Sequence, residues 1–428
     1  MRVFATVFIF LCFCLQAQTI KQCQQRFSTY LNFHGSLNGS VKFSENSLSY
    51  FNPQGKKEYT FYEEELPALS LFFEQSTPAQ QEALLRTKGL KPLSKKQLDS
   101  LYNASQKKYP VASDQLMPLK GMKIALDPGH FSTNLADAQA EQKFLFFVKD
   151  SASGNPDTVK LFESLLTFHT ATILKGMLEE QGAIVFMSRN EADHTSFGCN
   201  FKTWMRNHRK RTLDSLLKAG NMPPEKHRKL QKCNEYTFFW DFFRDYDLAN
   251  RAKKINDFQP DITVIIHYNV DEKNAPWKQH TKKNFSMAFI GGAYTNDNLS
   301  KTESKMHFLR MLLSDQLNRS EVLSAYTVRN FNSVLSIAIA KSQDASYLKD
   351  NCLETNSPGV FCRNLVLCRK INSVLVYGES LYQDNENESR ILMRSDKDLY
   401  GVKTNERVMN VARSYYNGLM EYAQGIKR

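Results

Sequence analysis

Three side chains that can bind a metal ion stand where the sequence predicts the ends of buried elements. His130 and His267 each follow an apolar run, and Glu163 stands at the start of a segment with helical spacing. Catalytic zinc commonly takes three His, Asp or Glu ligands and leaves a fourth position for water. One glutamate with two histidines is therefore a chemically complete set for metal-assisted hydrolysis. The alternative is that each is an unrelated polar residue in a loop.

The elements that must position these residues alternate between strands and helices. Apolar strands are predicted at residues 122–126, 183–188, 262–266 and 373–377, and helices at 163–180 and 247–257. This alternation predicts an α/β fold, a doubly wound, mostly parallel and twisted sheet flanked by helices. Open α/β sheets bind ligands outside the carboxyl ends of their strands, and both histidines are predicted to lie there.

Four ordered segments resemble those of a known family, the zinc-dependent N-acetylmuramoyl-L-alanine amidases of the amidase-3 type. They are IALDPGH (124–130), the helix and strand of residues 163–189, LANRAKKINDFQPDITVIIHYN (248–269) and NSVLVYGESLYQDN (372–385). The resemblance extends over about residues 118–428 and does not include residues 19–117.

The resemblance implies a zinc amidase or exopeptidase-like fold that acts on peptidoglycan. It implies that His130, Glu163 and His267 ligate Zn²⁺, with Glu141 as a competing ligand in the long interval before Glu163. The bond implied is the amide between the lactyl group of N-acetylmuramic acid and L-alanine. Asn269 matches the H-x-N motif of the family and is expected to bind substrate, with a turn-stabilising role as the alternative. A protein activator of unknown identity is compatible with this function.

The catalytic glutamate of the family has a displaced counterpart in this chain. The last strand of the family reads V-L-V-E-x-G-F, whereas Tyr377 stands here at the glutamate position and Glu379 follows two residues later. Two residues along a strand correspond to about 6–7 Å on the same face, so Glu379 is predicted to be the general base. Glu386 and Glu388, in the loop predicted after this strand, are the alternatives.

The positive charge of the chain is concentrated in one segment. The 428 residues include 56 Lys and Arg against 44 Asp and Glu, a net charge of +12. Residues 200–232 hold ten Lys and Arg against two Asp and Glu. They belong to a predicted insertion at about 194–246, interpreted either as a basic, aromatic-lined wall that attracts anionic wall polymers or as a helical excursion packed by its own aromatics. A second insertion at about 271–330 contains an amphipathic segment, 304–317, which fits either a lid or core packing.

The beginning of the chain predicts export. Arg2 precedes an apolar run, residues 3–15, and small residues follow near Ala17, so residues 1–18 are predicted to be a signal peptide. The run is shorter than the roughly 20 residues that span a bilayer, so no integral membrane segment is expected after cleavage. An exported protein in the periplasm or cell envelope is not expected to bind nucleic acid.

The rest of the chain is predicted to form two domains. Residues 19–117 are expected to be a small α+β accessory domain of unknown role, with a strand pair within 40–51 and 57–65 and helices near 62–75, 78–88 and 94–108. Residues 118–428 are expected to be the catalytic domain.

Two other functions remain open from the sequence. One is a zinc carboxypeptidase or another metal-dependent amidohydrolase. The other is a catalytically inactive peptidoglycan-binding protein, which the displaced position of Glu379 makes credible.

Overall fold

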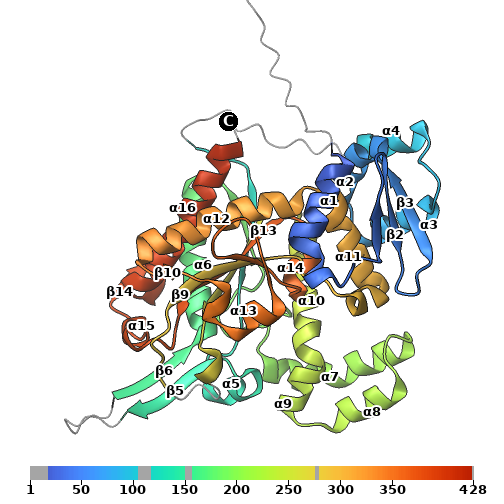
Figure 1. Ribbon diagram of the computed structural model, residues 1–428. Coiled ribbons are helices and arrows are strands. Elements are labelled where there is room, and N and C mark those ends of the chain that lie inside the picture. The colour runs from blue at the N-terminus through green and yellow to red at the C-terminus, as the bar shows by residue number, and fades with distance from the viewer. Residues whose placement is uncertain (1–17, 105–116, 150–156, 275–278, 427–428) are drawn as a thin grey trace, which may run out of the picture.

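The computed structural model describes residues 18–104, 117–149, 157–274 and 279–426 (Figure 1). Residues 1–17 of the predicted signal peptide and residues 105–116, just before the predicted domain boundary, lie outside the described residues. None of the helices in the described ranges combines the length and the apolar character needed to cross a bilayer.

A mixed sheet forms the centre of the described part of the chain, where eight strands join in the order β11-β12-β9-β13-β8-β4-β7, with β10 beside β9. The strands are β4 (Lys123–Pro128), β7 (Ile184–Met187), β8 (Ile262–Asn269), β9 (Phe285–Ile290), β10 (Ala338–Ile339), β11 (Leu353–Glu354), β12 (Val360–Cys362) and β13 (Val374–Tyr382). Strands β7, β4, β8 and β13 run parallel to one another, as predicted. Strand β9 runs antiparallel to β13 and lies inside the predicted second insertion, so part of that segment belongs to the sheet.

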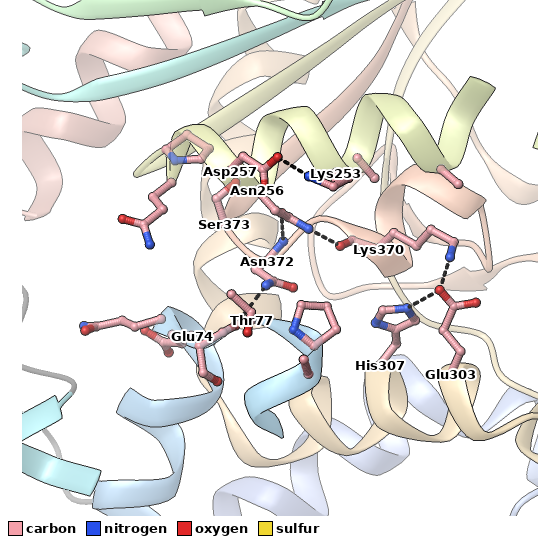
Figure 2. Close-up of a pocket in the computed structure, with 18 residues that line it drawn as sticks. Glu74, Thr77, Lys253, Asn256, Asp257, Glu303, His307, Lys370, Asn372 and Ser373 are labelled. Carbon is pink, nitrogen blue, oxygen red and sulfur yellow. Dashed lines mark hydrogen bonds and ion pairs between the residues drawn. The ribbon is translucent and has the colours of Figure 1, made fainter. Parts of the chain in front are cut away.

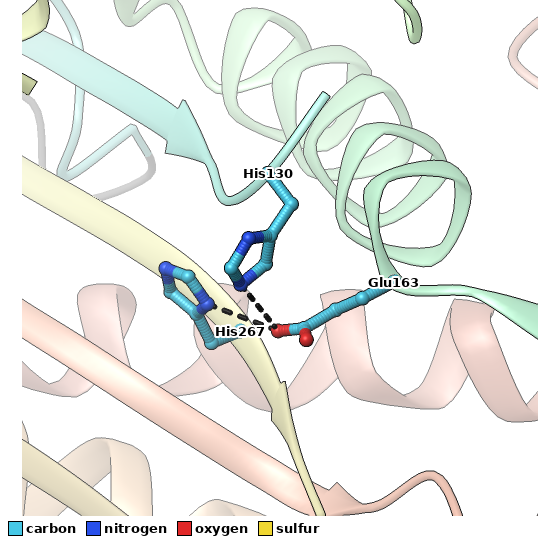
Figure 3. A group of neighbouring side chains, drawn as sticks. All are labelled: His130, Glu163 and His267. Atoms are coloured by element: carbon cyan, nitrogen blue, oxygen red, sulfur yellow. Dashed lines mark hydrogen bonds and ion pairs between the residues drawn. The ribbon is translucent and has the colours of Figure 1, made fainter. Parts of the chain in front are cut away.

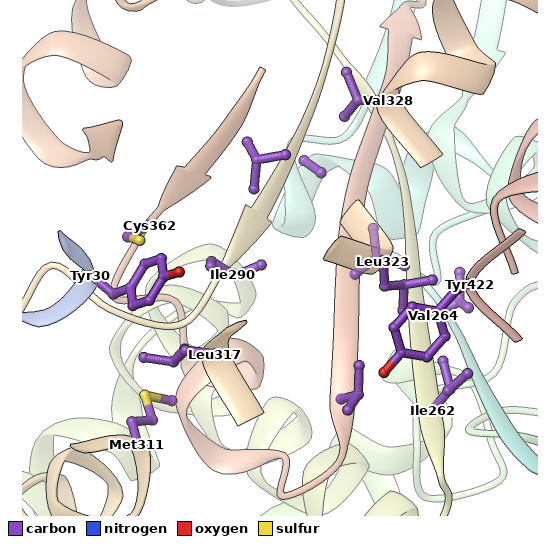
Figure 4. Packing of buried hydrophobic residues seen from close by; sticks show 14 of the residues in the cluster. Tyr30, Ile262, Val264, Ile290, Met311, Leu317, Leu323, Val328, Cys362 and Tyr422 are labelled. Atoms are coloured by element: carbon purple, nitrogen blue, oxygen red, sulfur yellow. The ribbon is translucent and has the colours of Figure 1, made fainter. Parts of the chain in front are cut away.

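Helices cover both faces of this sheet, which confirms the predicted doubly wound fold. One face packs against α6 (Glu163–Glu180), α12 (Gln316–Leu335) and α16 (Glu406–Ile426), and the other against α10 (Arg244–Phe258), α13 (Ser346–Asn351) and α14 (Val366–Lys370). Alternate residues of β13 enter the two cores: Val376 faces α12 and Leu375 faces α14. Figure 4 shows Leu323 of α12 beside Val264 of β8. Because both faces are buried, these strands are apolar throughout rather than alternating.

The segment before the sheet carries three strands rather than the predicted pair. Its elements are α1 (Ile20–Arg26), η1 (Phe27–Leu31), β1 (Val41–Phe43), β2 (Ser47–Phe51), β3 (Lys57–Tyr62), α2 (Leu66–Gln75), α3 (Pro78–Lys88) and α4 (Lys95–Ala104). The predicted first strand is divided at Glu45 and Asn46, where the chain bends and β1 folds back on β2. The three predicted helices are present as α2, α3 and α4.

This N-terminal segment shares its core with helix α11 (Thr302–Leu313), as Figure 1 shows. The rings of Phe27 and Phe308 lie 6.5 Å apart, and Arg26 Nε donates a hydrogen bond of 3.0 Å to the carbonyl oxygen of Leu312. Every residue of α11 from Met306 onward is buried. Helix α11 is therefore a core element that anchors the N-terminal segment, and the lid interpretation of residues 304–317 is wrong.

A cavity of about 400 Å³ lies where the N-terminal segment meets the sheet (Figure 2). Its lining includes Pro260 and Asn372, which precede β8 and β13. The cavity therefore opens at the amino ends of the strands, away from the edge at which open α/β sheets bind ligands.

The basic insertion folds around its own aromatic core. It contains α7 (Phe201–Lys218), α8 (Pro224–Lys232), α9 (Glu235–Phe238) and η4 (Phe239–Phe243), and η4 continues directly into α10. Phe243 packs 4.6 Å from Trp204, while Arg206 and Arg228 are exposed. The aromatic residues thus fill the interior of the insertion, and its surface is basic. Phe131, which follows His130, also inserts into this cluster, so the insertion adjoins the candidate metal loop.

Shortening Phe243 tests whether this aromatic cluster holds the insertion together. We expect Phe243→Ala to lower the free energy of unfolding by about 3–5 kcal/mol, because the ring is fully buried among other aromatic rings. Urea unfolding followed by tryptophan fluorescence measures the change. Tyr236→Ala, at a half-exposed ring of the same insertion, is the matched control and should cost less than about 0.5 kcal/mol. Equal effects of the two variants would contradict the assignment.

Candidate metal centre and active site

His130, Glu163 and His267 converge at the carboxyl ends of the parallel strands (Figure 3). His130 follows β4, His267 lies near the end of β8, and Glu163 is the first residue of α6. One ligand atom from each lies within 4.8 Å of the others. Glu163 Oε1 is 3.0 Å from His267 Nδ1 and 3.4 Å from His130 Nε2. Residues separated by 137 positions in the sequence thus form one compact group that could hold a metal ion.

The Glu163 carboxylate is held on both of its oxygens. The backbone N–H of Tyr268 donates to Oε1 at 3.2 Å, and the side-chain amide of Gln383 donates to Oε2 at 3.1 Å. Burial would raise the pKa of Glu163, but His130 and His267 lower it well below its usual value. The carboxylate therefore stays charged and aimed at the two histidines. Sequence reasoning missed Gln383, whose one signal is its place just after an apolar strand.

Glu141 lies behind His130 rather than among the three converging residues. Its Oε1 is 2.9 Å from His130 Nδ1, on the ring nitrogen opposite the one that faces Glu163. Its other oxygen accepts hydrogen bonds from the hydroxyl and the N–H of Ser132. Burial would raise the pKa of Glu141, but these partners lower it to about 2. A carboxylate in this position fixes the tautomer and orientation of a ligating histidine.

The long interval before Glu163 has a structure of its own. It holds α5 (Leu135–Glu141) and a hairpin of β5 (Phe144–Lys149) and β6 (Asp157–Phe162), which projects from the body in Figure 1. The hairpin ends directly before Glu163, and α5 ends at Glu141, so folded elements place both of these residues.

Two buried arginines hold the turn that carries His130. Arg189 donates to the carbonyl oxygens of Pro128 and Gly129, both at 3.1 Å. Arg251 donates to the carbonyl oxygen of Pro128 at 3.0 Å and to that of His130 at 3.5 Å. These interactions bind the carbonyl oxygens of a non-helical segment, and the Thr167 hydroxyl adds a hydrogen bond of 2.6 Å to that of Gly129.

Glycine is required at position 129 because the His267 ring packs against it. A Cβ atom at this position would lie 2.2 Å from His267 Cε1, far inside contact distance. His130 itself has a φ of 59°, a left-handed conformation that costs energy for a residue with a side chain. The Pro-Gly-His turn is therefore strained and closely packed, and its arginine partners hold it in place.

Glu379 lies directly beside His267 across the sheet. The two residues are paired in the register of β13 and β8, so their side chains share one face. Burial and the neighbouring Glu163 carboxylate raise the pKa of Glu379 to about 8. Tyr377 lies on the same face, and its ring stacks on the His267 imidazole with centroids 4.5 Å apart and planes 4° from parallel. Tyrosine at the family's glutamate position thus stacks on His267, and the Glu379 carboxylate stands two residues farther along the strand.

The remaining candidate residues are Asn269, Glu386 and Glu388. Asn269, near the end of β8, donates from Nδ2 to the Tyr347 hydroxyl at 2.9 Å. Glu386 and Glu388 lie in helix α15 (Glu386–Leu392) rather than in a loop. Glu388 pairs with Arg407 and is buried, which gives it a structural role.

Residues 124–403 match the family described as N-acetylmuramoyl-L-alanine amidase, and the chain belongs to that family. The match begins at β4 and includes His130, Glu163, His267 and Glu379. No curated protein sequence matches the chain at a significant level.

Solved structures of amidases align with the chain at low identity. The CwlD amidase from Clostridioides difficile, in complex with the GerS lipoprotein, is 14% identical with a TM-score of 0.38 and covers 71% of this chain and 100% of its own. Ami1 from Mycobacterium abscessus is 13% identical with a TM-score of 0.35 and covers 71% and 99%. The catalytic domain of CwlV from Bacillus (Paenibacillus) polymyxa var. colistinus is 12% identical with a TM-score of 0.33 and covers 71% and 98%.

Adding one methyl group at Gly129 tests the packing of the metal group. We expect Gly129→Ala to displace the His267 ring, to weaken binding of Zn²⁺ measured by titration calorimetry, and to cost about 1–3 kcal/mol of stability. Gly39→Ala is the control, because a Cβ atom there would meet nothing within 4 Å. Zinc affinity equal to that of the unsubstituted protein would show that the ring and Gly129 do not constrain each other.

Proposed function

We propose that this protein is a zinc-dependent amidase that hydrolyses the bond between the lactyl group of N-acetylmuramic acid and L-alanine in peptidoglycan. Membership of the amidase family supports the reaction class. The observation that carries the proposal is the convergence of His130, Glu163 and His267 beside Glu379 at one sheet edge. Export by the predicted signal peptide would bring the enzyme to this substrate in the periplasm or cell envelope.

The residues present fit a zinc ion. Two imidazoles and one carboxylate form a donor set typical of catalytic zinc, with a position left for water. Burial lowers the pKa of His267 to about 4, so its ring is neutral near pH 7, the form in which histidine binds metals. The Glu379 Oε2 atom is buried without a hydrogen-bond partner among the described residues, an arrangement that suits a nearby cation or its water. His130, Glu163 and His267 would hold the zinc.

The protein's own residues then supply positioning and proton transfer. When bound, zinc acts as a Lewis acid that polarises the amide carbonyl and makes water a better nucleophile. Glu379 accepts a proton from the attacking water and returns it to the nitrogen of the leaving L-alanine. Burial raises its pKa above that of an exposed glutamate, which favours its holding the proton until the leaving nitrogen takes it. Glu141 keeps His130 oriented, and Asn269 is proposed to contact the substrate from the end of β8.

Muropeptide digestion tests the proposed function directly. Purified protein should contain zinc and release free stem peptides from purified sacculi, and chelation should stop the release until zinc is restored. Release of single terminal D-amino acids would indicate a carboxypeptidase instead. Binding to sacculi with no cleavage, by protein loaded with zinc, would indicate an inactive wall-binding protein.

Substitution of the proposed base separates metal binding from proton transfer. We expect Glu379→Gln to retain zinc and to lose about 10²–10⁴-fold in kcat, because the amide cannot accept the water's proton. Glu386→Gln, a carboxylate in α15 outside the converging group, is the matched control and should remain active. Undiminished hydrolysis by Glu379→Gln would overturn the proposed role.

The basic surface of the insertion is proposed to attract the anionic polymers of the cell wall. Arg206, Arg211 and Arg228 are exposed, and the insertion adjoins the His130 loop through Phe131. Charges of this kind raise the local concentration of an anionic substrate without taking part in the chemistry.

Neutralising these charges should weaken binding before it alters catalysis. The triple variant Arg206→Gln, Arg211→Gln, Arg228→Gln is expected to bind sacculi about tenfold more weakly at low salt, from about 0.5 kcal/mol for each charge. Its cleavage of small soluble muropeptides should not change. Replacing Arg394, Lys397 and Lys403 by glutamine removes the same charge from another exposed region and serves as control. An equal loss of sacculus binding in both triple variants would show that binding depends on net charge alone and not on the basic surface of the insertion.

A further inference from the structure

Arg363 places an aromatic-supported cation on the same side of the sheet as the metal group. It follows strand β12, and its guanidinium lies 5.3 Å from the ring centroid of Phe289 and 5.0 Å from that of Tyr347. Contacts of this kind orient an arginine side chain and favour its charge. The planes of two rings thus hold the guanidinium in place, while its N–H groups point outward from its edge.

The N–H donors of the Arg363 guanidinium are not used by other protein groups among the described residues. Within the residues that the structure describes, the Arg363 side chain makes no hydrogen bond and no ion pair, and it is partly exposed. The two arginines beside the metal loop differ in this respect, since Arg189 and Arg251 are buried and donate to several carbonyl oxygens. An arginine held by neighbouring rings, with N–H donors that no protein group uses, can bind a carboxylate through paired hydrogen bonds.

A continuous row of aromatic rings connects Arg363 to the metal group. The Phe289 ring lies 5.9 Å from that of Tyr377, which in turn stacks on His267. Tyr347, the second ring under the guanidinium, accepts the hydrogen bond of Asn269. Phe289 and His267 are buried, whereas Arg363, Tyr347, Tyr377 and Asn269 are partly exposed.

We propose that Arg363 is a specificity-determining residue that binds the free α-carboxylate of the stem-peptide residue following L-alanine. This inference rests on the proposed amidase function. In an extended chain, that carboxylate lies about 7 Å from the L-alanine nitrogen. This part of the peptide would lead away from the metal group along the row of rings toward Arg363. The ligand is therefore an acidic peptide, and stems in which this carboxyl is amidated lack the charge that Arg363 would pair with.

The amidation state of the substrate gives a direct test. Two soluble muropeptides are compared, identical except that the α-carboxyl of the second residue is free in one and amidated in the other. The unsubstituted protein should cleave the free acid with a kcat/KM about 10- to 100-fold higher, mainly through a lower KM, as a charge-assisted hydrogen bond predicts. In Arg363→Gln the ratio between the two substrates should fall to about one.

Two further variants make the result specific. Arg363→Lys keeps the charge but not the paired geometry, and should restore part of the preference. Arg86→Gln, at an exposed arginine of α3, should keep the full preference. Unfolding midpoints of all variants show whether each is folded, and the preference of the unsubstituted protein tests the inference without any variant.

The outcomes separate this inference from the proposed function. Cleavage of both muropeptides at equal efficiency by the unsubstituted protein, or a full preference retained in Arg363→Gln, would overturn the role of Arg363 and leave the amidase activity standing. Failure of the zinc-loaded, unsubstituted protein to cleave either muropeptide would overturn the amidase activity, and the inference with it.

Discussion

The structure depends most on the hydrogen bonds between two buried arginines and the carbonyl oxygens of residues 128–130. Arg189 and Arg251 reach this turn from opposite sides of β4, one from the end of β7 and one from α10. The turn has a left-handed residue and a glycine packed against an imidazole ring, so it would not keep this shape alone. The two arginines donate several hydrogen bonds to the backbone carbonyl oxygens of this turn, and this network fixes where His130 points.

The basic insertion and the N-terminal segment both pack closely against the rest of the structure. The basic insertion encloses an aromatic cluster that Phe131 enters, so its fold and the metal loop stabilise each other. The N-terminal segment is joined to the sheet through α11, whose apolar residues pack in the same core (Figure 4). The insertion therefore has an apolar interior and a basic surface. Its Lys and Arg side chains can carry positive charge near the site without being buried.

Sequence reasoning located the converging residues because each stands beside an element with a strong pattern. His130 and His267 follow apolar strands, and parallel strands bring their carboxyl ends to one edge. The same reasoning missed β9, since a short strand inside a long insertion has no flanking helix to mark it, and it left Glu141 as a competing ligand rather than as the partner of His130. Sequence spacing does not tell which nitrogen of an imidazole a carboxylate will face. The only signal for Gln383 is its place after β13, and Arg363 has no local pattern.

The sequence by itself determined the α/β alternation, the identity of the three converging side chains and the carboxylate on the last strand. The alternation follows from periodicity and residue type, which are local properties, whereas the preference for Glu163 and the role of Glu379 follow from the resemblance of their segments to the amidase-3 family. Only the tertiary structure decided that Glu141 lies behind His130, that Tyr377 stacks on His267, and that Glu379 stands beside it. The physical reason is that orientation and pKa depend on burial and on partners from distant strands, which come together only when the sheet has formed.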